Sequence, residues 1–336
     1  MGLRIVATDF AIDLGTSNIL VYKKNQGVIL NEPSLIVLDE NNTKVLAVGD
    51  KAKEMIGKTP TNLHVVKPIV NGVITDFNLT EAMLNYFFDK VNSGFSFIQP
   101  KVVICVPSGI TDIASRAIED AALHAGSREI LLVDQSLAAA FGMGLNPEDP
   151  KGILLLNLGA GTSEVCVISL NGVVTSKTIN KGGDYIDQEI IDFFREKKNL
   201  DIGINTAEEV KKNILSLKVK DADLSMTVDG RDLISAAPKT VNVTSKDLVE
   251  CVIGYADEVI NMIYEVLEKT PPELTADIKR DGFGMTGALS HLKGMREYIE
   301  SKLKLTSYIS EDPATDAILG SGKILEDPDR FLKYRK

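Results

Sequence analysis

The stretch "AIDLGTSNILVY" (Ala11–Tyr22) leads an apolar run into a turn of small residues, and a second stretch repeats this design. In "LLLNLGAGTSEVCVIS" (Leu154–Ser169) an apolar run again reaches a glycine turn and continues as a β-rich run. The first stretch carries an acid, Asp13, where the second carries an amide, Asn157. Two matched strand-turn-strand patterns predict a duplicated fold with a chemically important turn in each copy.

The same succession of elements follows each stretch. Asn25-Gln26-Gly27 and Asn171-Gly172 separate β-rich runs and predict hairpins. Further strands are expected at 28–39 and 173–180, and helices at 80–91 and 184–198. We therefore expect an α/β fold of two duplicated halves, 1–149 and 150–336, with smaller subdomains at about 31–75 and 185–250.

Composition excludes several classes of function. The net charge is −10 and no long basic run occurs, so we expect no nucleic-acid partner. Cys105, Cys166 and Cys251 are far apart in the sequence, which fits a reducing cytoplasm. No run approaches the roughly 20 apolar residues of a membrane span, so we expect neither secretion nor a spanning helix.

Both turns have the composition of phosphate-binding turns, because small side chains let backbone N–H groups approach an anion. One such turn alone is usually only a turn, but two matched turns predict a shared polyphosphate. The residues are Gly15, Thr16, Ser17 and Asn18 in the first turn, and Gly159, Ala160, Gly161 and Thr162 in the second. Asp13 would hold Mg²⁺ through water; the alternative is that Asp13 accepts hydrogen bonds only from its own turn.

From these turns outward, the chain resembles the actin superfamily, and more narrowly the MreB family of bacterial actins, over nearly its whole length. Stretches that carry the resemblance, in order, include "IDLGTSNILVY", "GVILNEPS", "NGVITDF", "SLAAAFG", "GGDYIDQEII", "TAEEVKKNI" and "EDPATDAILGSGKIL". The resemblance implies an actin-like ATPase fold with a nucleotide cleft between the halves, ATP and Mg²⁺ as ligands, and self-assembly into protofilaments. It also implies a cytoplasmic cytoskeleton at the inner face of the cell membrane that organises cell shape, with other cell-shape proteins as partners.

The resemblance assigns further residues to the nucleotide. Glu208 and Lys211 lie in the helix that borders the ribose and adenine in this family, and Gly287 begins the turn that backs the nucleoside. Without the resemblance, Glu208 and Lys211 would be interpreted as an i,i+3 ion pair on a solvated helix face.

Three elements depart from the family pattern. Asn157 replaces an aspartate and brings no charge to Mg²⁺ or to an attacking water. Asp134 and Gln135, the candidate catalytic pair, replace two glutamates, and Ala288 replaces a glycine. We therefore expect a nucleotide-binding filament subunit with weak hydrolysis. The alternatives are a fully active ATPase of the actin, chaperone and sugar-kinase superfamily, or a structural polymer that needs no nucleotide.

A short segment between a predicted helix and strand, "NSGFSFIQP", carries Phe95, Phe97 and Ile98. Large apolar residues in a loop indicate insertion into a membrane interface or contact with a partner, and the corresponding loop in the resembled family contacts the membrane. The alternative is that these side chains fold back onto the core.

Overall fold

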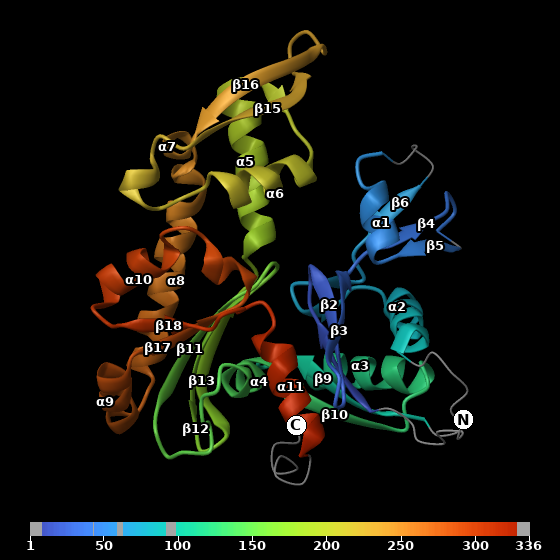
Figure 1. The fold of residues 1–336 in the computed structure, drawn as a ribbon, viewed down its shortest axis with the longest axis vertical. Helices are drawn as coiled ribbons and strands as arrows, with labels where there is room; N and C mark the ends of the chain where they lie inside the picture. The colour runs from blue at the N-terminus through green and yellow to red at the C-terminus, as the bar shows by residue number, and fades with distance from the viewer. Residues whose placement is uncertain (1–8, 43, 59–62, 92–98, 328–336) are drawn as a thin grey trace. The chain divides into compact units, whose positions relative to one another are not determined.

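The computed structural model describes residues 9–42, 44–58, 63–91 and 99–327. The chain forms two compact units, whose elements are labelled in Figure 1. Unit 1 comprises Met1–Lys151, Ile168–Ser176 and Ser310–Lys336, and unit 2 comprises Gly152–Val167 and Lys177–Ile309. The predicted halves, 1–149 and 150–336, describe the duplication of the sequence and remain a prediction.

The main sheet of unit 1 contains five strands in the order β10-β9-β1-β2-β3. Their bounds are Glu129–Asp134, Lys101–Val106, Phe10–Leu14, Asn18–Lys23 and Gly27–Pro33. Strands β1, β2 and β3 form the predicted antiparallel hairpins, whereas β1, β9 and β10 run parallel. The core of this unit consists of the apolar side chains of the sheet together with those of helices α2 (Phe77–Val91) and α3 (Asp112–His124). Near the carboxyl ends of the parallel strands lie two candidate site residues, Asp13 in β1 and Asp134 in β10.

The predicted strand 28–39 is two strands. It ends as β3 at Pro33 and resumes as β4 (Ile36–Leu38), which belongs to a separate sheet with β5 (Val45–Val48) and β6 (His64–Val66) beside helix α1 (Asp50–Met55). Pro33 has no N–H to continue a ladder, and the Ser34 N–H donates to the Ser17 carbonyl instead. The short hairpin of β7 (Ile69–Val70) and β8 (Val73–Ile74) follows.

Helix α11 (Asp316–Glu326) packs closely on α4 (Gln135–Gly142), as Figure 1 shows. Glycines permit this approach: a side chain at Gly320 would overlap the Ala138 carbonyl, and one at Gly142 would overlap the Asp316 carbonyl. The Lys323 ammonium donates to the Phe141 carbonyl at 2.6 Å. A segment close to the end of the sequence thus holds the helix that begins immediately after Asp134.

The second five-stranded sheet has the order β13-β12-β11-β17-β18. The strands are Gly172–Ile179, Ser163–Ser169, Ile153–Leu158, Phe283–Thr286 and Ser307–Ile309. A small sheet has the order β14-β15-β16, with bounds Leu200–Asp201, Ser225–Asp232 and Pro238–Thr244. The helices of unit 2 are α5 (Gly183–Lys198), α6 (Ile204–Asn213), α7 (Ser245–Leu248), α8 (Glu250–Glu268), α9 (Pro272–Asp281) and α10 (Met295–Leu303).

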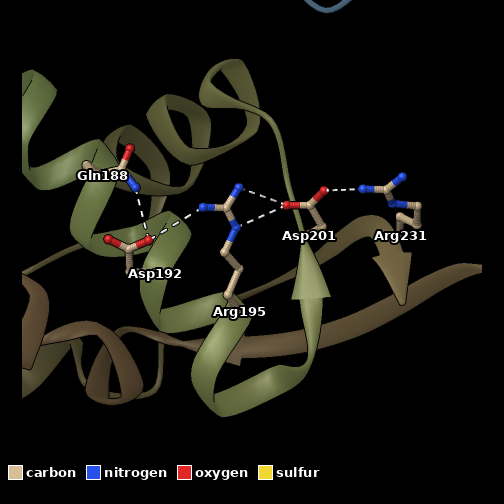
Figure 2. Close-up of polar contacts among 5 residues, drawn as sticks. All are labelled: Gln188, Asp192, Arg195, Asp201 and Arg231. Atoms are coloured by element: carbon tan, nitrogen blue, oxygen red, sulfur yellow. Dashed lines mark hydrogen bonds and ion pairs between the residues drawn. The ribbon is translucent and has the colours of Figure 1, made fainter. Parts of the chain in front are cut away.

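An exposed polar network joins the end of α5 to the small sheet (Figure 2). Arg195 donates two hydrogen bonds to Asp201 Oδ1, at 3.1 and 3.0 Å, and Arg231 donates to Asp201 Oδ2 at 2.8 Å. These guanidinium groups lower the pKa of Asp201. On the same helix, Asp192 accepts from Gln188 and lies 3.7 Å from Arg195. This network faces the solvent, whereas another acid of α5, Asp187, is buried on a different face of the helix.

Candidate functional site

The first glycine turn leaves backbone donors free. Gly15 is required because a Cβ there would overlap the Asn18 carbonyl oxygen. The Thr16 hydroxyl accepts from the Gly72 N–H, and the Asn18 amide donates to Asn31 Oδ1. In the described part of the chain, the N–H groups of Thr16 and Ser17 have no acceptor. The turn therefore offers two successive donors, as phosphate binding requires.

Asp13 lies at the end of β1 beside this turn. The residue is 6% exposed, and burial raises the pKa of its carboxyl group to about 6, an effect that a hydrogen bond from Gln135 partly offsets. The bond joins Gln135 Nε2 to Asp13 Oδ1 at 3.0 Å. Asp13 lies near the carboxyl end of β1 and Gln135 follows the carboxyl end of β10, and both strands run parallel to β9, which lies between them. The two residues therefore occupy the edge where such sheets bind ligands. This hydrogen bond comes from Gln135 and not from the turn that follows Asp13.

Asp134 forms hydrogen bonds at the start of α4, whereas its neighbour Gln135 donates to Asp13. Its Oδ1 accepts from the Ser108 hydroxyl at 2.6 Å and from the N–H groups of Ser136 and Leu137 at 3.0 and 3.3 Å. These bonds make Asp134 the N-cap of α4. Of the predicted catalytic pair, Gln135 reaches Asp13 directly, whereas Asp134 fixes the start of the helix that carries Gln135.

The second glycine turn caps a helix with its carbonyls. The Gly159 and Ala160 carbonyls accept from the N–H groups of Gly183 and Asp184 at the start of α5, at 3.1 and 2.9 Å. In a trans peptide the N–H points opposite to the carbonyl. The N–H groups of Ala160 and Gly161 therefore point away from α5, and neither has an acceptor among the residues that the structure describes.

Glycines also fix the surroundings of this second turn. A Cβ on Gly182 would overlap the carbonyls of Gly159 and Ala160. Gly287, with φ of 84°, follows β17, and a Cβ there would come within 2.6 Å of Asn157 Oδ1. Asn157 therefore packs against the backbone of Gly287, a contact that the sequence did not reveal. Ala288 is exposed at the start of a short 3-10 helix, Ala288–His291, so its methyl group does not fill the interior.

The interpretation of Glu208 and Lys211 as an ion pair with each other is wrong. Glu208 Oε1 pairs with Lys212 at 2.6 Å, whereas the Lys211 ammonium pairs with Asp187 Oδ2 at 2.6 Å and donates to the Gly183 carbonyl at 3.0 Å. Because α6 packs on α5, the partner of Lys211 comes from the neighbouring helix. Sequence reasoning missed Asp187, although its signal was present: an acid on the buried stripe of α5 with Ile186, Ile190 and Phe194.

Two further expectations concern metals and membranes. Within the described ranges, no three His, Cys, Asp or Glu side chains gather into a metal-binding group. Nor is any helix described there both long and apolar enough to cross a membrane. Phe95, Phe97 and Ile98 lie outside the described residues.

The fold and the paired glycine turns define an actin-like protein. The model of the MreB/Mbl protein family matches residues 7–333, and the chain belongs to this family. It is 37% identical over 329 residues to the cell shape-determining protein Mbl of Bacillus subtilis, covering 98% of this chain and 99% of that protein. It is 38% identical over 326 residues to the cell shape-determining protein MreB of Escherichia coli K12, covering 95% and 94%.

Solved structures agree with this assignment. The crystal structure of MreB5 of Spiroplasma citri bound to AMPPNP matches with a TM-score of 0.92 and 30% identity, covering 98% of each chain. A MamK double helical filament matches with a TM-score of 0.80 at 19% identity, covering 95% of this chain and 99% of that one, which shows the fold alone. The predicted actin-like α/β fold and the predicted family are confirmed.

Proposed function

We propose that this chain binds ATP with Mg²⁺ and assembles into membrane-associated filaments that organise cell shape, with weak hydrolysis. The observation that carries nucleotide binding is the repeated turn: each unit has two successive backbone N–H groups without an acceptor in the described chain. Free, adjacent N–H groups in a glycine turn are the donors that phosphate oxygens need. The nucleotide-bound structure of the Spiroplasma relative supports the same ligand class.

The residues present fit this ligand. The N–H groups of Thr16 and Ser17, and those of Ala160 and Gly161, would bind phosphate oxygens. Mg²⁺, when bound, would neutralise phosphate charge, and a single carboxylate suffices to hold it through water because the ion keeps much of its hydration shell. Asp13 is the carboxylate in position for this role, and Gln135 orients it. Lys211, Glu208 and Gly287 would contact the nucleoside.

Weak hydrolysis follows from the chemistry of the second turn. Asn157 stands at the end of β11 without a charge, so it cannot attract a cation or take a proton from water. Gln135 is likewise neutral, and it positions Asp13 rather than acting as a base. Binding groups are therefore complete in both units, whereas groups for proton transfer are sparse.

Filament formation and membrane association rest on the family. The relatives are named cell shape-determining proteins, and a protein of the same fold forms a double helical filament. We place the chain in the cytoplasm, at the inner face of the membrane, with copies of itself as the principal partner and other cell-shape proteins as further ones. The proposed membrane contact is the segment with Phe95, Phe97 and Ile98.

One experiment separates this proposal from its two alternatives. Calorimetry with ATP, with and without Mg²⁺, measures binding, while sedimentation and phosphate release measure assembly and turnover on the same sample. Mg²⁺-dependent binding with filaments and slow phosphate release is the expected result. Filaments without any nucleotide binding would support the structural polymer, and rapid release would support a fully active ATPase.

The membrane contact has its own test. Burial of each large apolar side chain contributes roughly 1.5–3 kcal/mol, so many subunits in a filament would bind far more firmly than one. Phe97→Ser with Ile98→Ser should leave polymerisation intact and release filaments from liposomes in co-sedimentation. If this variant pellets with liposomes like the wild type, the membrane role is wrong.

A further inference from the structure

The buried acid Asp187 is held on one side only. Its side chain is 5% exposed, and Oδ2 binds the Lys211 ammonium at 2.6 Å. Its other oxygen, Oδ1, is buried without a hydrogen-bond partner in the described part of the chain. A buried carboxylate oxygen without a donor is costly. Such a group in a folded protein calls for an explanation other than packing.

The Lys211 ammonium also has one hydrogen-bond donor without an acceptor among the described residues. An ammonium has three donors, and the described residues supply Lys211 with two acceptors, Asp187 Oδ2 and the Gly183 carbonyl. Its side chain is 12% exposed. One N–H is therefore available to a ligand that reaches the ammonium.

The position of this ammonium relates it to the second glycine turn. Gly183 separates the two: a Cβ built on it would lie 3.2 Å from Lys211 Nζ and 3.7 Å from the Ala160 Cα. Ala160 is one of the residues whose backbone N–H is free. The unused ammonium donor and the free turn donors thus lie on either side of one glycine, within unit 2.

We propose that Asp187 is a positioning residue for nucleotide binding: it holds the Lys211 ammonium on the Gly183 carbonyl beside the second turn and leaves one N–H for an acceptor atom of the nucleotide. This inference rests on the proposed function. Asp187 itself is covered and does not touch the nucleotide. Its effect passes through Lys211, which without this anchor could adopt many conformations of its long side chain.

The energetics argue against a purely stabilising ion pair. Burial raises the pKa of Asp187 to about 6, and the nearby charge of Lys211 does not restore the usual value; Glu208 and Asp184 raise it further. An acid whose pKa is raised on folding costs stability above that pKa. The attraction within a buried ion pair often does not offset the desolvation of its two charges, and apolar residues of similar size would then give a more stable fold. A costly pair beside a predicted ligand site favours a functional role.

The test is a double-mutant cycle on nucleotide affinity. Asp187→Asn and Lys211→Met should each weaken binding of AMPPNP with Mg²⁺ about tenfold in calorimetry, the effect of one charge-assisted hydrogen bond. The double variant should be no worse than Lys211→Met alone, because both changes remove the same contact. Asp192→Asn, on the exposed side of α5 (Figure 2), is the matched control and should bind as the wild type does.

A pH profile distinguishes positioning from structure. The ratio of wild-type to Asp187→Asn affinity should be about ten at pH 7.5 and approach one at pH 5, because protonation of Asp187 releases Lys211. Titration of the phosphates and of Asp13 changes the affinity of both proteins equally, so its effect cancels in the ratio. Lys211→Met should show the same convergence with the wild type, so the profile remains decisive if Asp187→Asn does not fold.

A second readout needs no nucleotide. In the free protein at pH 7.5, thermal unfolding should show that Asp187→Asn is still fully folded at the temperature of the titration, although its affinity falls. Lower stability with unchanged affinity, or fully additive losses in the double variant, would overturn the positioning role while nucleotide binding by the wild type still supports the proposed function. Absence of wild-type binding would overturn both.

Discussion

The two glycine turns share a backbone design but differ in the residue that precedes them. In unit 1 the strand ends in Asp13, a buried acid that accepts a hydrogen bond from Gln135. In unit 2 the corresponding Asn157 packs against the backbone of Gly287 and carries no charge. Both turns keep two free N–H donors. The proposed donors for phosphate are therefore present in both turns, whereas a carboxylate precedes the first turn alone.

Removing that carboxylate should have the largest effect. Asp13→Ala should weaken Mg²⁺-dependent binding of ATP about 100-fold or more, because the cation would lose its one protein anchor and Gln135 its acceptor. Calorimetry with and without Mg²⁺ measures the difference. The matched change in the other turn, Asn157→Ala, should cost much less and should not alter the Mg²⁺ dependence. Equal losses in the two variants would show that Asp13 is not the metal-side group.

The same acid should lower the stability of the empty protein. Its pKa is about 6 in the folded state against 3.8 for the ordinary group, so the folded state binds more protons between these values. The free energy of unfolding then falls as the pH rises from about 4 to 6 and stays reduced above. Asp13→Asn has no carboxyl group to ionise at this position, so its free energy of unfolding should not fall in this way.

In EDTA at pH 7.5, Asp13→Asn should therefore be about 2–3 kcal/mol more stable than the wild type in urea unfolding. At pH 4 the two proteins should be nearly equal, which controls for effects of the amide itself. A variant that equals the wild type at pH 4 but is less stable at pH 7.5 would mean that the Gln135 contact outweighs the desolvation of the carboxylate.

The turns should also differ in their tolerance of a methyl group. Gly15→Ala would overlap the Asn18 carbonyl, whereas a Cβ on Gly159 would lie 3.0 Å from the Thr162 carbonyl, which is tight. Overlap with backbone forces the turn to shift, so Gly15→Ala should lower the free energy of unfolding by about 1–3 kcal/mol and Gly159→Ala by less. Thermal unfolding of both variants gives the comparison. Equal costs would show that the two turns relax equally well.

The sequence predicted the elements that depend on local signals. Small residues after apolar strands located both turns, and Asn25-Gln26-Gly27 located the hairpin between β2 and β3. The sequence did not predict interactions between side chains that only the packing of the fold brings together. Lys211 lies three residues from Glu208, but its partner is Asp187, 24 residues away on α5. A strand was likewise predicted to pass through Pro33, where the chain leaves one sheet for another.

The smallest effect concerns the missing charge of the second turn. Asn157→Asp should speed phosphate release from bound ATP severalfold, because a carboxylate at the end of β11 can accept a proton or attract the cation. The effect should be modest because Gln135 remains neutral. Single-turnover phosphate release at saturating ATP measures turnover separately from binding.

Adding Asp134→Glu tests whether the first acid of the helix takes part. Asp134 Oδ1 already accepts from Ser108 and from two N–H groups of α4, and a longer side chain would disturb this cap at a cost of about 1 kcal/mol. We therefore expect the double variant to be less stable than Asn157→Asp and no faster. A further increase in phosphate release in the double variant would instead place residue 134 in proton transfer and restore the catalytic role predicted from the sequence. No change in either variant would show that the second turn does not limit hydrolysis.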